Sequence, residues 1–418
     1  MSRKKDMDFI GRFSPAVVVI VLFGVISMLG DIVYESARGA NSQYLNLMGI
    51  SAAKVGLVFG IGEFLGYALR LMAGIVSDKS GRYWFFMFIG YGMLLSVPLM
   101  GLTAEWSLLV VLMLTERIGK ALRNPAKDTV LSGVAEDQVG IGFAFGLQEA
   151  LDQLGAFLGP LVFTAVFHFA GENGIREYRL GYKLLVVPFI ALMLFLYYAY
   201  KRIQGSGLLS KAEKRHFENE KLEPVFWSYT VFAFFCTVGF VNFSTIGYHL
   251  KANQLMSDGN ITLLYSLAML VDAVAAIVVG KAYDRMKEKT GKKTGGILVL
   301  AVIPLMTMLL PLLTLSHSTT LIAMGMMLFG IVMGAHETIM RSAIADITPY
   351  RKRGTGYGIF NSAYGMALLA GSALMGLFYD MKQTNMIVAF TAVAEIIAVA
   401  LYIQMHRAIK SSRPDSFR

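Results

Sequence analysis

The sequence has a single cysteine and few charged side chains. Cys236 stands alone in a chain of 418 residues, which excludes an internal disulfide framework and a metal site built from cysteines. Charged residues make up 16% of the chain and hydrophobic residues 56%, a balance that excludes an ordinary soluble domain. The chain is rich instead in glycine, with 42 residues, and in methionine, with 25, and both suit closely packed membrane helices.

The motifs of common enzyme classes are also missing. The chain has no glycine-rich phosphate loop of the Walker type, which argues against ATP-driven pumping. It has no His-x-x-x-His zinc spacing, its six histidines are scattered, and no serine elbow stands in a suitable context. We therefore expect a protein that is not an enzyme and that holds no cofactor and no metal. Because the first twelve residues are polar and basic, we also expect no cleavable signal peptide.

Twelve hydrophobic stretches are long enough to cross a bilayer, which takes about 20 helical residues. We expect an all-α membrane protein with two pseudo-symmetric six-helix bundles, at 1–202 and 225–418, joined by a charged linker at 203–224. The predicted spans are 15–45, 55–77, 84–103, 107–134, 141–168 and 182–202 in the first bundle, and 225–250, 261–284, 294–315, 319–346, 355–379 and 384–406 in the second.

The basic residues predict the orientation of these spans. If the N-terminus is cytoplasmic, most of the 38 Lys and Arg residues fall in cytoplasmic segments. By the positive-inside rule both termini are then cytoplasmic, and we expect a multi-pass protein of the inner membrane. The net charge of +10 is a topology signal and does not indicate nucleic-acid binding, because these charges are spread over loop ends. The few basic residues in the opposite loops are Lys54, Arg176, Arg179, Lys183, Lys251 and Lys382.

A short motif is repeated about half a chain apart, each time where a hydrophobic helix ends. The first copy reads GIVSDKSGR from Gly74 to Arg82, and the second reads GKAYDR from Gly280 to Arg285. This Gly-x-x-x-Asp-(Arg/Lys) turn, once per half, resembles the major facilitator superfamily of secondary transporters. The resemblance implies gating roles, through a charge network at the cytoplasmic end, for Asp78, Arg82, Asp284 and Arg285.

The fifth predicted span contains the sequence GAFLGP, with glycines at Gly155 and Gly159 followed by Pro160. It matches the core of an element that, in the superfamily that the chain resembles, is typical of exporters that exchange substrate for protons. The resemblance implies a part in gating for these three residues. The alternative is helix packing alone, since glycines four residues apart let helices approach closely.

The most informative side chains are the charges within the predicted spans. Asp31, Glu35 and Arg38 are spaced i, i+4 and i+7 along one helix face, with Tyr34 at its border. A charge at mid-bilayer costs about 3 kcal/mol or more, so these groups must face a watery cavity or one another. In the superfamily, helices 1, 4, 7 and 10 line the central cavity. We therefore predict a substrate- and proton-binding site that comprises Asp31, Tyr34, Glu35, Arg38, Arg117, Glu149, Asp152, Asn242, His336, Glu337 and Asn361.

Structural ion pairs are the alternative role for several of these charges. The spacing favours Glu35 with Arg38, Glu63 with Arg70, and Glu116 with Lys120. Asp31 has no cation within one turn in sequence. A carboxylate in a partly dry cavity can exchange protons near neutral pH, and we expect Asp31 to bind substrate or protons.

The working hypothesis is a monomeric, proton-coupled exporter of a small molecule, embedded in the lipid bilayer. Protonation of its carboxylates would displace the substrate, and deprotonation would restore the site. The carboxylates favour a cationic, zwitterionic or amphipathic substrate, whereas Arg38, Arg117 and Arg123 leave an anionic one open. The alternatives are a proton symporter that imports a metabolite, a non-transporting membrane sensor, and a lipid flippase.

Overall fold

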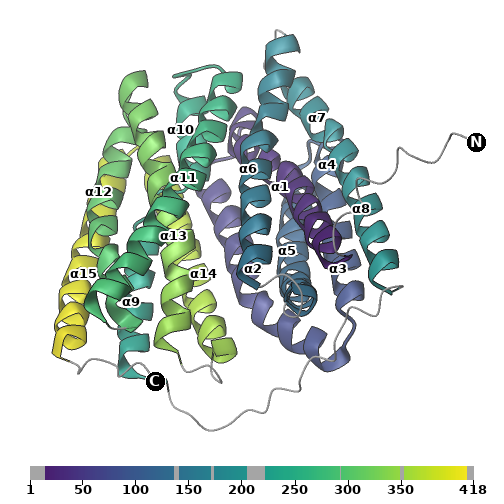
Figure 1. The fold of residues 1–418 in the computed structure, drawn as a ribbon. Coiled ribbons are helices and arrows are strands. Elements are labelled where there is room, and N and C mark those ends of the chain that lie inside the picture. The colour runs from purple at the N-terminus through teal and green to yellow at the C-terminus, as the bar shows by residue number, and fades with distance from the viewer. Residues whose placement is uncertain are drawn as a thin grey trace, which may run out of the picture.

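The structure is a computed structural model, and it describes residues 15–135, 141–170, 174–204, 222–291, 293–348 and 353–411. Every regular element in these residues is a helix. In Figure 1 the helices form two groups side by side, one made of α1 to α8 and the other of α9 to α15. We call these groups the N-half and the C-half. The predicted all-α fold is confirmed.

The N-half contains six passes, of which two are built from more than one helix. The third pass bends at the short 3-10 helix η2 (Met93–Leu95), and the sixth is divided at Leu185. Its helices are α1 (Pro15–Leu47), α2 (Ala52–Ser80), α3 (Tyr83–Gly92), α4 (Ser96–Met100), α5 (Trp106–Ala135), α6 (Ile141–Ala170), α7 (Ile175–Leu184) and α8 (Val186–Gln204).

The C-half repeats this count of six passes. Its first pass is broken between Gly239 and Asn242, where the Asn242 side chain caps the second segment. Its helices are α9 (Pro224–Val238), α10 (Phe243–Ala252), α11 (Asp258–Thr290), η3 (Lys293–Ala301), α12 (Val302–Thr314), α13 (Thr319–Ile347), α14 (Arg353–Asp380) and α15 (Thr384–Ser411).

Eleven helical spans among the described residues are long and apolar enough to cross a membrane. The twelfth pass is α5, which is 30 residues long but carries charges such as Glu116, Arg117 and Lys120 along its length. Twelve crossings therefore match the prediction. One predicted boundary is wrong, since the sixth pass begins at Ile175 and not at residue 182. The predicted linker at 203–224 lies largely outside the described residues.

The first copy of the repeated motif has a clear local role at the end of α2. Gly81 adopts a left-handed conformation, with φ of 64°, and its N–H bonds to the carbonyl of Ser77. Glycine adopts this backbone without steric cost, so the helix ends sharply there. Gly291, with φ of 60°, ends α11 in the same way in the other half.

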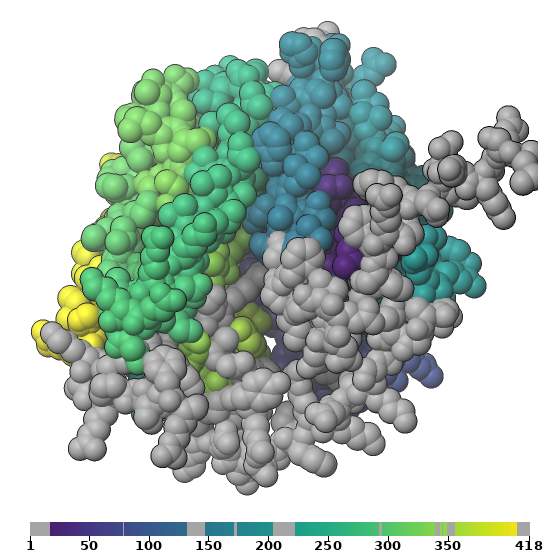
Figure 2. Space-filling view, viewed as in Figure 1, coloured from purple at the N-terminus to yellow at the C-terminus, as the bar shows by residue number. Residues whose placement is uncertain are grey.

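The two halves meet closely at the end of the molecule drawn uppermost in Figure 1. The Tyr248 hydroxyl donates to the carbonyl of Ile50 at 2.9 Å, and the hydroxyls of Thr164 and Thr262 lie 2.8 Å apart. Figure 2 shows the surfaces of α6 and α11 touching in this upper part. We call this region the closed end. The C-terminus of α15 lies at the opposite end (Figure 1).

Candidate functional site

A cavity of about 660 Å³ lies between the two halves. Its walls come mainly from α1, α2, α5 and α6 on one side and from α10, α11, α13 and α14 on the other, with Tyr91 of α3 and the segment before α10 also contributing. The residues that line it occupy the middle of these helices and the parts nearer the end opposite the closed end. This volume is in the range of pockets that hold a small organic molecule.

The structure brings most of the predicted site residues to this one cavity. Asn361 is the exception, because it is not among the described residues that line the cavity. The predicted residues that line it are Asp31, Tyr34, Glu35, Arg38, Arg117, Glu149, Asp152, Asn242, His336 and Glu337.

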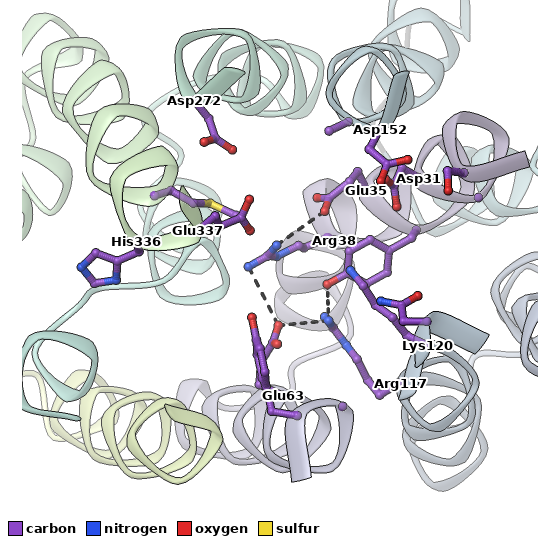
Figure 3. Close-up of a pocket in the computed structure, with 18 of the residues that line it drawn as sticks. Asp31, Glu35, Arg38, Glu63, Arg117, Lys120, Asp152, Asp272, His336 and Glu337 are labelled. Carbon is purple, nitrogen blue, oxygen red and sulfur yellow. Dashed lines mark hydrogen bonds and ion pairs between the residues drawn. The ribbon is translucent and has the colours of Figure 1, made fainter. Parts of the chain in front are cut away.

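Glu63, on α2, joins two arginines at the centre of the cavity. Its carboxylate lies 3.0 Å from Arg117 and 3.9 Å from Arg38 (Figure 3). Arg38 also pairs with Glu35 at 3.5 Å, as the spacing predicted. The Arg70 guanidinium, which the spacing pairs with Glu63, lies over the Tyr67 ring, 4.6 Å from its centroid. The ion pairs of Glu63 described above join it to Arg117 and Arg38, which lie on α5 and α1.

Arg117 is held by three groups at once. Besides Glu63, it pairs with Glu116 at 3.3 Å and donates to the Tyr34 hydroxyl. Glu116 was predicted to pair with Lys120, but the Lys120 ammonium lies over the Tyr34 ring, 3.8 Å from its centroid. A cation over an aromatic face is stabilised by the ring quadrupole. Tyr34 therefore positions two cations of α5 on the cavity wall.

Glu35 also connects the two halves directly. The Tyr265 hydroxyl, on α11 of the C-half, donates to the Glu35 carboxylate at 2.7 Å. Glu35 is buried, and its carboxylate contacts both Arg38 of its own helix and Tyr265 of the other half. The sequence did not point to Tyr265 as a site residue, because nothing in its local sequence indicates that it reaches the other half.

The glycines of the GAFLGP element bring α6 against α1. A methyl group at Gly155 would lie 2.4 Å from the Met28 carbonyl oxygen, and one at Gly159 would lie 2.9 Å from that of Ile32. The Ser36 hydroxyl donates to the Gly159 carbonyl at 2.5 Å across the same contact. Pro160 lies against Gly39 of α1, one turn further along. These glycines thus have a packing role.

This packing places two carboxylates next to each other. Asp152 of α6 is an acidic neighbour of Asp31 of α1, and Figure 3 shows both on one side of the cavity. Their basic neighbours are Lys120 and Lys127 of α5. No Lys or Arg nitrogen in the described part of the chain lies within 4.0 Å of Asp31. Asp31 therefore stands among charges without forming an ion pair.

The C-half contributes a smaller set of polar groups. Asn242 accepts a hydrogen bond from the Thr245 N–H at 3.2 Å and donates to the Ser372 hydroxyl, so part of its role is to cap α10. His336 is buried, with its ring 5.4 Å from that of Phe240. Asp272 and Glu337 extend into the cavity from α11 and α13 (Figure 3).

Three of the predicted gating residues, Arg82, Asp284 and Arg285, are exposed and are not among the residues that line the cavity. The side chain of Asp78 lies outside the described residues. A neighbouring network that the sequence did not indicate joins α11 to α13. Asp346 accepts from the Tyr283 hydroxyl at 2.8 Å and from the Lys287 ammonium at 2.9 Å.

Comparison with known proteins places the chain in a family. The family model described as "Major Facilitator Superfamily" matches residues 16–334 and 246–417. An uncharacterized protein of Mycobacterium bovis is 31% identical over 404 residues, which cover 94% of each chain. The class H tetracycline resistance protein of Pasteurella multocida is 26% identical over 157 residues, 37% of this chain and 38% of that protein.

Among solved structures, a bacterial homologue of the human lysosomal transporter Spinster, in an inward-facing and occupied conformation, has the same fold. It superposes with a TM-score of 0.70 at 16% sequence identity, covering 97% of this chain and 100% of that one. The twelve passes in two groups, the charged cavity between them and the match of the family model along the chain lead to one conclusion. The chain belongs to the Major Facilitator Superfamily, a family of membrane transporters.

Proposed function

We propose that this transporter is a proton-coupled antiporter that exports a cationic, zwitterionic or amphipathic small molecule across the inner membrane. The position of Asp31 carries the proposal. Asp31 faces the cavity beside Asp152, near but not paired with Lys120. Two adjacent carboxylates repel each other when both are charged, so the pair readily takes up a proton. Such a pair can couple protonation to the release of a cation.

The other charged side chains of the cavity support the assignment of proton exchange to Asp31 and Asp152. Glu35, Glu63 and Arg117 are already engaged in ion pairs or hydrogen bonds, which hold the wall of the cavity in place. We therefore assign proton exchange to Asp31 and Asp152, which are not part of these ion pairs. Protonation of this pair would remove negative charge from the cavity and weaken its hold on a cationic substrate. Deprotonation would restore it.

Alternating access follows from where the halves touch. With both termini cytoplasmic, as the positive-inside rule indicates, the closed end faces outward and the cavity is reached from the cytoplasm. Export is supported by the GAFLGP element and by the partial similarity to a tetracycline resistance protein. We further propose that the chain works as a monomer, because the two halves of one chain supply the residues that line the cavity.

The test uses purified protein in lipid vesicles with the membrane potential clamped. Uptake of tetraphenylphosphonium, a permanent cation, and of glycine betaine, a zwitterion, is measured with the vesicle interior either acidic or alkaline. An antiporter accumulates its substrate when the interior is acidic, because protons leave as substrate enters. Protein-free vesicles give the passive background, and a permanent charge avoids trapping by protonation.

The same measurement separates the alternatives. A symporter would accumulate substrate only when the interior is alkaline. Binding without uptake under either gradient would identify a sensor. Uptake that ignores the pH gradient would contradict proton coupling while leaving transport intact.

A further inference from the structure

The C-half wall of the cavity holds a carboxylate that the proposed proton exchange does not use. Asp272, on α11, is 2% exposed, and its Oδ1 atom has no hydrogen-bond partner among the described residues. Burying a carboxylate without a partner is energetically unfavourable, so such a group usually has a hydrogen-bond donor or a cation as its partner. Figure 3 shows its carboxylate directed into the cavity.

The charged surroundings of Asp272 are mostly of its own sign. Three other carboxylates of the cavity, Glu337, Glu35 and Glu149, lie in its surroundings, and so does one basic side chain, Arg38. Arg38 is already shared between Glu35 and Glu63. No Lys or Arg nitrogen of the described chain lies within 4.0 Å of Asp272. The surroundings of Asp272 therefore carry more negative than positive charge.

The C-half side of the cavity also carries apolar, polarisable side chains. Met269 lies one turn before Asp272 on α11, and Met333, Phe240 and Phe243 of the C-half also line the cavity. Methionine sulfur and aromatic faces suit an organic cation, since both can lie against a diffuse positive charge. In the described part of the chain no group of three or more His, Cys, Asp or Glu could hold a metal ion. This favours an organic cation over a metal.

We propose that Asp272, with Glu337 beside it, is the subsite for the positively charged group of the substrate, an organic ammonium or a similar cation. This inference rests on the proposed function, because it requires that the cavity bind cargo. In this proposal the two halves have different roles. Protons are exchanged at Asp31 and Asp152 in the N-half, and the charge of the substrate is recognised in the C-half.

The test is equilibrium binding to the full chain in detergent, without any gradient. Tetraphenylphosphonium is the cationic probe, and tetraphenylborate is an anion of nearly the same size and shape. We expect the wild type to bind the cation and not the anion. Asp272→Asn should weaken cation binding by about tenfold or more, as expected when a charge-assisted contact is lost in a dry site. Glu337→Gln should weaken it less.

Asp258→Asn is the matched control. Asp258 is also on α11 and also 2% exposed, but it pairs with Lys251 at 2.7 Å and does not line the cavity. Its variant should bind the cation as the wild type does. Melting temperatures without ligand show that each variant is folded. If Asp272→Asn melts below the assay temperature, Asp272→Glu provides the test, because it keeps the charge and should retain binding.

Three results would overturn the subsite. The first is that folded Asp272→Asn binds the cation with unchanged affinity. The second is that Asp31→Asn loses more cation affinity than Asp272→Asn does. The third is that the wild type prefers tetraphenylborate or binds neither probe. None of them concerns proton coupling, which the vesicle assay measures separately. Conversely, transport that does not respond to the pH gradient, together with loss of cation binding in Asp272→Asn, would support the subsite and contradict proton antiport.

Discussion

Asp380, the last residue of α14, accepts a hydrogen bond from the backbone N–H of Ala52 at 2.8 Å. Its second oxygen accepts from the N–H of Ala53 at 2.9 Å. A C-half carboxylate thus caps the first turn of an N-half helix, where the helix dipole and unpaired N–H groups favour an anion. The contact lies at the closed end, so it must break whenever that end opens.

Asp380→Asn should therefore shift the protein toward the state that is open at this end. A carboxylate at a helix N-terminus contributes roughly 0.3–1 kcal/mol, so the ratio of the two states should change by a few fold. Spin labels at Lys54→Cys and Lys382→Cys, both exposed positions, report the separation of the halves there. Cys236 is buried and should not react. An unchanged distance distribution would show that other contacts determine closure.

Asp31→Asn should abolish proton-driven transport without unfolding the protein. The amide cannot exchange protons, but it keeps the shape of the carboxylate. Vesicle uptake with an acidic interior should fall to the level of protein-free vesicles, while the melting temperature stays within a few degrees. Full pH-driven uptake by this variant would refute the assignment. The same uptake measurement on Asp152→Asn then shows whether Asp152 also takes part in proton exchange.

Tyr265→Phe should destabilise the protein by removing the hydroxyl that bonds to Glu35. A buried hydrogen bond to a charged group is worth about 1.5–3 kcal/mol, and its loss leaves one carboxylate oxygen less satisfied. The melting temperature should fall by several degrees. Tyr198→Phe, at an exposed position, is the matched control and should melt like the wild type. Equal melting of both variants would mean that the bond across the halves contributes little.

Gly155→Ala should disrupt the contact between α1 and α6. The added methyl would lie 2.4 Å from the Met28 carbonyl oxygen, a backbone atom that can move only with its helix. We expect a clear loss of melting temperature, together with weaker proton coupling because Asp31 and Asp152 move apart. Gly92→Ala is the control, since a methyl there meets nothing within 4 Å. That variant should be neutral or slightly stabilised, as alanine favours a helix over glycine.

The predicted spans show what local sequence can decide. Hydrophobicity over about 20 residues and the helical repeat are properties of contiguous chain, so the crossings could be counted without a structure. The sixth pass was misplaced because Arg176, Arg179 and Lys183 interrupt its apolar run. Arg179 donates instead to the carbonyls of Gly101 and Leu102, each at 3.0 Å. A charge satisfied by a neighbouring helix does not end the helix that carries it.

That Asp31, Glu35 and Arg38 share a helix face could be predicted from the sequence, because spacing along one helix sets the direction in which each side chain points. The sequence also indicated that these charges avoid lipid, because exposing them there costs much free energy. Their partners became visible only in the folded structure. The links of Glu63 to Arg117, of Tyr265 to Glu35 and of Asp380 to Ala52 join different helices. These partners depend on the rotation, depth and approach of each helix, which packing determines and no single segment encodes.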